Sequence, residues 1–133
     1  MKTLLLIGIA ALSAGCAMNE EVESDRVDAD LLASELRGYE QAGAPVSCVS
    51  LRDLRGNRSA GEGAIIFDGS GRQLWVNRPR DGCPNMRFGH ALRINTTMSR
   101  LCSGEIVTVF DPVARLDVGS CSVGEFTPYR RTR

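Results

Sequence analysis

The sequence predicts a small, mainly β domain in which an antiparallel sheet, barrel-like or a sandwich, is cross-linked by two disulfides and preceded by one N-terminal amphipathic helix. Three observations support this fold class. Beyond Pro45, short runs rich in Val, Ile and Thr are separated by Gly, Asp, Asn and Pro, which is typical of antiparallel strands and turns. Four cysteines, an even set, lie in this region. Helical spacing of apolar residues is found in the segment before it.

The N-terminal segment has the order of regions found in a secretory signal peptide. Lys2 is followed by the apolar run Leu4–Leu12 and then by small residues up to Cys16. The run is about half the ~20 apolar residues that a transmembrane helix needs, so a membrane span is not predicted. The segment resembles a bacterial lipoprotein signal, although Ser13 stands where such signals usually carry Leu. This resemblance implies that residues 1–15 are removed and that Cys16 carries a lipid.

The residue after Cys16 bears on location. In bacterial lipoproteins an Asp at that position tends to hold the protein in the inner membrane, whereas this chain has Ala17. The resemblance therefore implies a lipid-anchored protein on the periplasmic face of the outer membrane.

Export changes the meaning of the remaining cysteines. In an oxidising compartment Cys48, Cys83, Cys102 and Cys121 predict two disulfides. No two of them are close in the sequence and His90 is the single histidine, so a zinc site is not predicted. A nucleophilic pair of Cys48 and His90 is the alternative, but an exported thiol normally oxidises.

Four cysteines allow three pairings. We prefer Cys48 with Cys121, because the first and last strands of a small closed or sandwiched sheet are commonly neighbours. This choice leaves Cys83 to pair with Cys102.

The chain is long enough for one domain after removal of a signal peptide. We divide it into five segments: a signal peptide (1–15), a tether (16–23), a helix and linker (24–44), a β domain (45–128) and a basic tail (129–133). Acidic residues concentrate between Asn19 and Glu40, but the formal net charge of the whole chain is zero. A neutral total argues against a dedicated nucleic-acid-binding protein.

The helix is predicted over Ser24–Tyr39, where apolar residues recur at spacings of three and four. These residues are Val27, Leu31, Leu32, Leu36 and Tyr39. Ser24 or Asp25 caps its start and Gly38 ends it. We expect the helix to pack on the domain, with binding to a partner protein as the alternative.

Six strands are predicted from short β-rich runs: Val46–Leu51, Ala64–Asp68, Arg72–Asn77, His90–Thr96, Glu105–Phe110 and Ser120–Phe126. The second and third form a hairpin across the turn Gly69–Gly71. Alternation places Leu74 and Val76 on one face of that hairpin and Trp75 on the other. Loops are predicted over Arg52–Gly63 and Arg78–Arg87.

Several short motifs together resemble a family of small proteobacterial lipoproteins grouped as a domain of unknown function. The motifs are Cys48–Asp53, Val76–Arg78, Gly82–Pro84, Ser99–Cys102, Glu105–Val107, and Ser120 and Cys121 with Gly124 and Phe126–Pro128. The chain departs from the family pattern at Glu105, where Asp is expected, and in the glycine-rich stretch Arg55–Gly63. The resemblance implies a fold and a location, and it implies no activity.

We expect a noncatalytic envelope lipoprotein that binds another envelope component, either a protein or a polysaccharide. Five arginines, with Trp75, are candidates for a surface that recognises carboxylates or phosphates. They are Arg52, Arg55, Arg58, Arg78 and Arg80. The alternative is that the arginines form a solvated face and that Trp75 covers the edge of the core. No cofactor is expected.

Two other classes of function stay open. The loop Arg78–Arg87 would suit an inhibitor that inserts a segment into the active site of a periplasmic or invading hydrolase. A hydrolase using two carboxylates would draw them from Asp53, Asp68, Glu105 and Glu125. The chain has no Gly-x-Ser-x-Gly elbow or phosphate loop, so we do not expect an enzyme.

Overall fold

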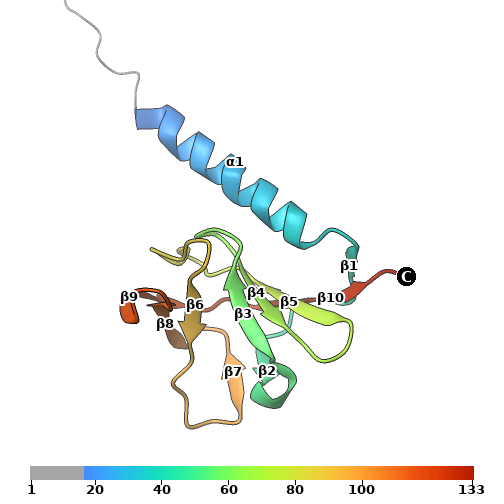
Figure 1. Cartoon of the computed structure of the whole chain (residues 1–133). Coiled ribbons are helices and arrows are strands. Elements are labelled where there is room, and N and C mark those ends of the chain that lie inside the picture. Colours follow the sequence, from blue (N-terminus) through green and yellow to red (C-terminus); the bar gives the residue numbers. More distant parts are fainter. Residues whose placement is uncertain (1–16) are drawn as a thin grey trace, which may run out of the picture.

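The computed structural model describes residues 17–133 and has the predicted fold class: mainly β, with antiparallel sheets, one helix and two disulfides (Figure 1). The elements are α1 (Ala17–Glu35), β1 (Tyr39–Gln41), β2 (Cys48–Ser50), the short helix η1 (Leu51–Asp53), β3 (Gly56–Ser59), β4 (Ile65–Asp68), β5 (Gln73–Asn77), β6 (Ala91–Arg93), β7 (Arg100–Cys102), β8 (Ile106–Asp111), β9 (Leu116–Ser122) and β10 (Phe126–Arg131). The predicted signal peptide and Cys16 lie outside the described residues.

The strands form three antiparallel sheets. The largest has the order β1-β10-β5-β4-β3, the smallest pairs β2 with β7, and the third has the order β6-β8-β9. The two ends of the domain meet in the large sheet, where Tyr39 lies opposite Arg131 and a further bridge joins Val46 to Phe126. The segments that were predicted as first and last strands, Val46–Leu51 and Ser120–Phe126, meet at this isolated bridge, but β2 within the first of them pairs with β7.

The predicted hairpin is confirmed as β4 and β5. Ile65 pairs with Asn77 and Phe67 with Trp75 across it. Its turn is closed by a hydrogen bond from the Gly69 amide to the Gln73 carbonyl, at 2.9 Å. A side chain at Gly69 would place its Cβ 2.9 Å from that same carbonyl oxygen, so the turn requires glycine here.

One face of the large sheet forms the main core. This disulfide-side core has twelve buried residues drawn from all three sheets and their loops: Val49, Ile65, Phe67, Cys83, Met86, Leu92, Leu101, Val107, Val109, Cys121, Val123 and Phe126. The rings of Phe67 and Phe126 lie 5.6 Å apart, centroid to centroid. Trp75 is partly buried against this core and its indole Nε1 has no hydrogen-bond partner in the described chain. Trp75 therefore covers the core edge and is not a surface platform.

The opposite face of the sheet forms a smaller, helix-side core. Its six buried residues are Leu32, Ala60, Ala64, Ile66, Leu74 and Val76. Leu74 and Val76 thus share one face and Trp75 takes the other, as the alternation predicts. Burial on both faces explains why β4 is continuously apolar over Ile65–Phe67.

The helix differs from its prediction at both ends. It begins at Ala17, so the predicted tether is helical over Ala17–Glu23, where Ala, Met and Glu have high helix propensity. It ends at Glu35 instead of Tyr39, and Gly38 follows in a left-handed conformation.

Helix α1 contacts the domain mainly through its second half. Leu32 is buried, whereas Val27, which was expected on the same face, is 57% exposed. The Asp28 carboxylate accepts hydrogen bonds from the amides of Glu62 and Gly63 at 3.0 and 3.3 Å. The carboxyl end of the helix lies close to β1 (Figure 1).

Several strand predictions were wrong in their bounds. Gly56–Ser59 was predicted as loop but pairs with β4 as edge strand β3. The predicted last strand, Ser120–Phe126, divides between β9 and β10. Most of the predicted basic tail therefore belongs to β10. Pro128 misled the prediction, because proline is rare in a central strand.

The number of disulfides was predicted correctly but their pairing was wrong. Cys48 bonds to Cys102 and Cys83 bonds to Cys121. Cys48 and Cys102 lie directly opposite each other in β2 and β7, with Cα atoms 4.0 Å apart. The last strand is β10, which has no cysteine, whereas Cys121 lies on β9 in another sheet. Adjacent first and last strands therefore do not bring Cys48 to Cys121.

Candidate functional site: a polar pocket beside both disulfides

A polar pocket of about 680 Å³ lies among three loops that connect different sheets. Its lining comprises Arg78, Arg80, Asp81, Gly82, Ser103, Gly104, Ser122, Val123, Gly124 and Glu125. These residues come from the β5–β6, β7–β8 and β9–β10 connections and the end of β9. We call this the disulfide pocket, because both disulfides border it.

Each of the three segments that form the disulfide pocket is covalently fixed one residue away. Gly82 precedes Cys83, Ser103 follows Cys102 and Ser122 follows Cys121. A disulfide restricts both partners to a narrow range of separations and directions. The bond between Cys83 and Cys121 therefore joins the Gly82 and Ser122 segments to each other, and the bond between Cys48 and Cys102 joins the Ser103 segment to β2.

Hydrogen bonds hold the same segments together. The fully buried Asn77 side chain donates to the Gly124 carbonyl and accepts from the Gly124 amide, both at 2.8 Å. The amide of Gly104 donates to the Val123 carbonyl at 2.8 Å. A Cβ at Gly124 would lie 2.1 Å from the Arg78 carbonyl oxygen, so glycine is required where these backbones meet.

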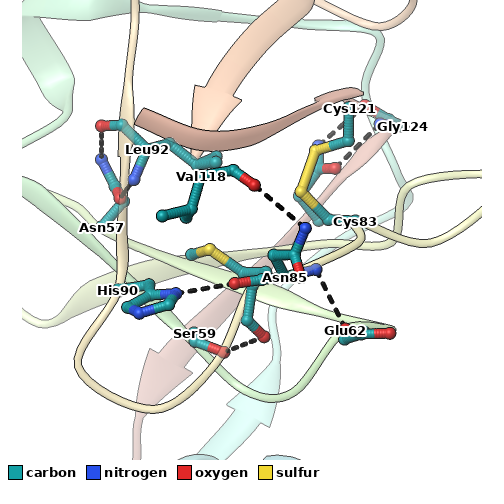
Figure 2. Close-up of a disulfide and its surroundings, with 12 residues drawn as sticks. Asn57, Ser59, Glu62, Cys83, Asn85, His90, Leu92, Val118, Cys121 and Gly124 are labelled. Atoms are coloured by element: carbon teal, nitrogen blue, oxygen red, sulfur yellow. Dashed lines mark hydrogen bonds between the residues drawn. A yellow bond between two sulfur atoms is a disulfide. The ribbon is translucent and has the colours of Figure 1, made fainter. Parts of the chain in front are cut away.

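The loop Arg78–Arg87 is also held by hydrogen bonds of Asn85 (Figure 2). Asn85 donates from its amide to the Glu62 carboxylate at 3.0 Å and from its side chain to the Val118 carbonyl at 2.9 Å. The Cys83 amide donates to the Glu62 carbonyl at 2.7 Å. The loop thus has little freedom to rearrange.

His90 has a structural position beside this loop. Its Nδ1 lies 2.6 Å from the Asn85 carbonyl oxygen and its Nε2 lies 3.7 Å from the Asp111 carboxylate. Hydrogen bonds from the amides of Ala114 and Val113 hold the pKa of Asp111 below its ordinary value, and His90 adds to this effect. Because Cys48 is bonded to Cys102, the alternative of a nucleophilic pair of Cys48 and His90 is wrong.

The predicted recognition residues separate in the structure. Arg78 and Arg80 are both exposed and line the disulfide pocket. Arg52 is exposed on η1 and does not line it, and Trp75 packs against the core.

Arg58 is also separate from the pocket. Its guanidinium is paired with Glu35 at 2.8 Å and with Asp68 at 2.5 Å. Partial burial lowers the pKa of Arg58, but the hydrogen bonds to the two carboxylates outweigh this effect and raise it. These pairs join α1 to β3 and β4, so Arg58 has a structural role.

The candidate carboxylates also lie apart. Asp53 is exposed on η1, Asp68 pairs with Arg58, and Glu105 accepts a hydrogen bond from the Cys102 amide. Glu125 is the one of the four that lines the disulfide pocket, where the second acid is Asp81.

Sequence reasoning missed one acid and several small members of the disulfide pocket, including Asp81, Ser103, Ser122 and Gly124. A signal for them exists in the glycines close to three of the cysteines, at Gly82, Gly104 and Gly124. Glycines near cysteines indicate backbones that approach each other closely around a cross-link.

Among residues 17–133, no group of three or more His, Cys, Asp or Glu side chains is placed to hold a metal ion. The helix in this range is not apolar enough to cross a membrane.

Comparisons with known proteins identify the family. Neither the curated proteins nor the solved structures include a match to this chain. A family model covers residues 1–132. The chain therefore belongs to the family of unknown function DUF6491.

Proposed function

We propose that the protein is a noncatalytic lipoprotein of the bacterial envelope, anchored at the periplasmic face of the outer membrane through a lipid on Cys16. Its disulfide pocket binds another envelope component, a protein or a polysaccharide that carries acidic groups. The order of regions in residues 1–15 supports the anchor. The pocket supports the binding role.

One observation carries the binding proposal: Arg78 and Arg80 project from a loop whose backbone is fixed by a disulfide and by hydrogen bonds. A guanidinium group forms paired hydrogen bonds with carboxylates and phosphates, and such bonds are strongest where the donor is held in place. Little conformational entropy is then lost on binding.

The other lining residues of the disulfide pocket restrict the class of ligand that it can bind. Asp81 and Glu125 balance the two arginines, and Ser103 and Ser122 add hydroxyl groups. A ligand with only negative charge would be repelled by the two acids. The pocket instead suits a carboxylate accompanied by amine or hydroxyl donors, as in a peptide segment or an acidic amino-sugar polymer.

A double substitution tests the pocket. The full chain carrying R78A/R80A is expected to bind purified cell-wall glycopeptide at least about tenfold more weakly, because each lost charged hydrogen bond is worth about 1.5–3 kcal/mol. The control is R52A/R55A, which removes the same charge from exposed arginines outside the pocket. Equal binding by both variants and the unmodified protein would refute the pocket as the binding site.

The anchor has a separate test. Mass spectrometry of the amino-terminal peptide from membrane-extracted protein should show a diacylglyceryl group on Cys16. Cys16→Ala should abolish this modification. An unmodified amino terminus would refute the anchor and leave the pocket proposal standing.

Inhibition of a hydrolase is the second candidate function, favoured by one observation. The exposed Arg80 and Asp81 lie between the buried residues Pro79 and Cys83, so a short polar segment is presented on a fixed backbone. Inhibitory loops benefit from this rigidity. Addition of the protein to lysozyme-type enzymes should slow them, and R80A/D81A should abolish the effect. Unchanged rates with the native protein would reject this function.

A further inference from the structure

A second charged hollow lies at one end of the neighbouring strands β5 and β10, where β5 begins and β10 ends. It measures about 690 Å³ and its lining residues are Arg72, Arg130, Arg131 and Arg133. All four are exposed. In Figure 1 this region is at the marked C terminus, beside β1.

Hydrogen bonds fix the backbone at Arg72, Arg131 and Thr132. The Arg131 amide donates to the Arg72 carbonyl at 2.9 Å, which joins the two segments directly. Thr132 donates from its amide and from its hydroxyl to the Gly38 carbonyl, at 2.8 and 3.0 Å. The Arg131 guanidinium carbon lies 6.0 Å from the centre of the Tyr39 ring. Arg130 and Arg131 thus lie on the paired strand β10, and Arg72 directly precedes its partner β5.

The charge of this cluster is unbalanced within the described part of the chain. Arg58 and Arg93 each have a carboxylate within 4 Å, whereas no ion pair of residues 17–133 involves the four arginines. Glu40 lies opposite Arg130 in the pairing of β1 with β10, yet the two side chains form no ion pair. Because the four arginines line one hollow, an anion bound there would lie among several positive charges.

We propose that Arg72, Arg130, Arg131 and Arg133 form a binding site for a diphosphate-type group, a ligand with two phosphates close together. Planar guanidinium groups match phosphate oxygens in pairs of hydrogen bonds, so four of them suit two adjacent phosphates better than one. The same chemistry occurs in a soluble diphosphate and in a phosphorylated lipid headgroup. This site is separate from the disulfide pocket and does not depend on the lipid anchor.

Calorimetric titration of the full chain with inorganic pyrophosphate tests the site. R72Q/R130Q should weaken pyrophosphate binding at least about tenfold, because several charged hydrogen bonds are lost together. The matched control R52Q/R55Q removes two exposed arginines elsewhere and should change the affinity less than about twofold. Circular dichroism and thermal melting show whether each variant is folded.

A conservative variant separates geometry from charge. R72K/R130K keeps the net charge but not the paired hydrogen bonds, so it should bind pyrophosphate more weakly than the native protein and more tightly than R72Q/R130Q. Equal weakening by R52Q/R55Q and R72Q/R130Q would overturn the site, because it would indicate nonspecific attraction to the whole protein. Native affinity in R72Q/R130Q would overturn it as well.

A second arm distinguishes the two sources of the ligand. Full-length Cys16→Ala protein is mixed with phosphatidylcholine vesicles that contain, or lack, a minor fraction of a lipid with a diphosphate headgroup. Binding to pyrophosphate and to the phosphorylated vesicles assigns the site to a headgroup, and binding to pyrophosphate alone assigns it to a soluble ligand. Vesicle binding that persists unchanged in R72Q/R130Q would reject the headgroup as the ligand of this site, because the vesicles would then be bound by another part of the chain.

Discussion

The two faces of the five-stranded sheet are covered in different ways. The disulfide-side core has twelve buried residues and involves all three sheets and both Cys83 and Cys121. The helix-side core has six, of which Leu32 alone comes from α1. Burial of apolar area is the main source of stability, so the comparison indicates that the fold depends chiefly on the disulfide side. Helix α1 is held on the sheet by a small apolar contact and by polar interactions such as the ion pair of Arg58 with Glu35.

Removal of the disulfides should lower the free energy of unfolding more than any other change proposed for the two faces. C83A/C121A opens a loop with a sequence separation of 38 residues, and C48A/C102A one of 54. The chain-entropy relation gives about 4 kcal/mol of lost stability for either. C83A/C121A should lose more than C48A/C102A, since Cys83 is fully buried and its loss also leaves a gap in the core. Urea unfolding measures both, and an unchanged midpoint in either variant would contradict the prediction.

The same substitution made on each side compares the two cores directly. Leu101→Ala on the disulfide side should lower the free energy of unfolding by about 3–4 kcal/mol, and Leu32→Ala on the helix side by about 2 kcal/mol. The reason is that Leu101 is 1% exposed within the larger core, whereas Leu32, on helix α1, is 8% exposed in the smaller core. A larger loss for Leu32→Ala, measured by urea unfolding, would reverse the order that we infer.

Gly124→Ala tests the backbone contact beside the disulfide pocket. The added Cβ would lie 2.1 Å from the Arg78 carbonyl oxygen, so the two segments must move apart and stability should fall by about 2–3 kcal/mol. Gly56→Ala is the control, because there the nearest atom, an Asp68 carboxylate oxygen, is 3.8 Å away. Equal melting temperatures for the two variants would show that the segments adapt easily.

The smallest effect is expected at the far end of the three-stranded sheet, from Asp111→Asn. The folded-state pKa of Asp111 is below its ordinary value of 3.8, through hydrogen bonds from the Ala114 and Val113 amides. The stabilisation by its charge is therefore complete above the unfolded pKa and is lost as the pH falls through the lower, folded pKa. The gap in melting temperature between native protein and variant should shrink from about pH 5 to about pH 3. A constant gap would show that the charge of Asp111 does not stabilise the fold.

The fold class and the central hairpin could be predicted because they depend on local patterns. The glycine turn and the apolar runs of β4 and β5 specify one pairing by themselves. Other elements depend on distant partners. β3 has the polar sequence of a loop, and it is a strand because Ser59 donates to the Met86 carbonyl and its backbone pairs with β4. Pro128 predicts the end of a strand, yet it lies opposite Trp75 within the sheet.

The candidate pocket was predictable only in part. Arg78 and Arg80 stand out in the sequence because they are close together in a loop beside Cys83. Glu125 was considered only as a candidate catalytic carboxylate, and its approach to the segment of Asp81 depends on Cys83 bonding to Cys121. Local patterns leave three pairings open for four cysteines, so the partner segments of the loop could not be identified.

The position of β10 has a consequence for biosynthesis. This last strand lies between β1 and β5 in the interior of the large sheet. A nascent chain that emerges amino terminus first therefore lacks the partner of both strands until β10 has left the ribosome. The pairing of β1 and of β5 along this side is completed only after β10 has been synthesised.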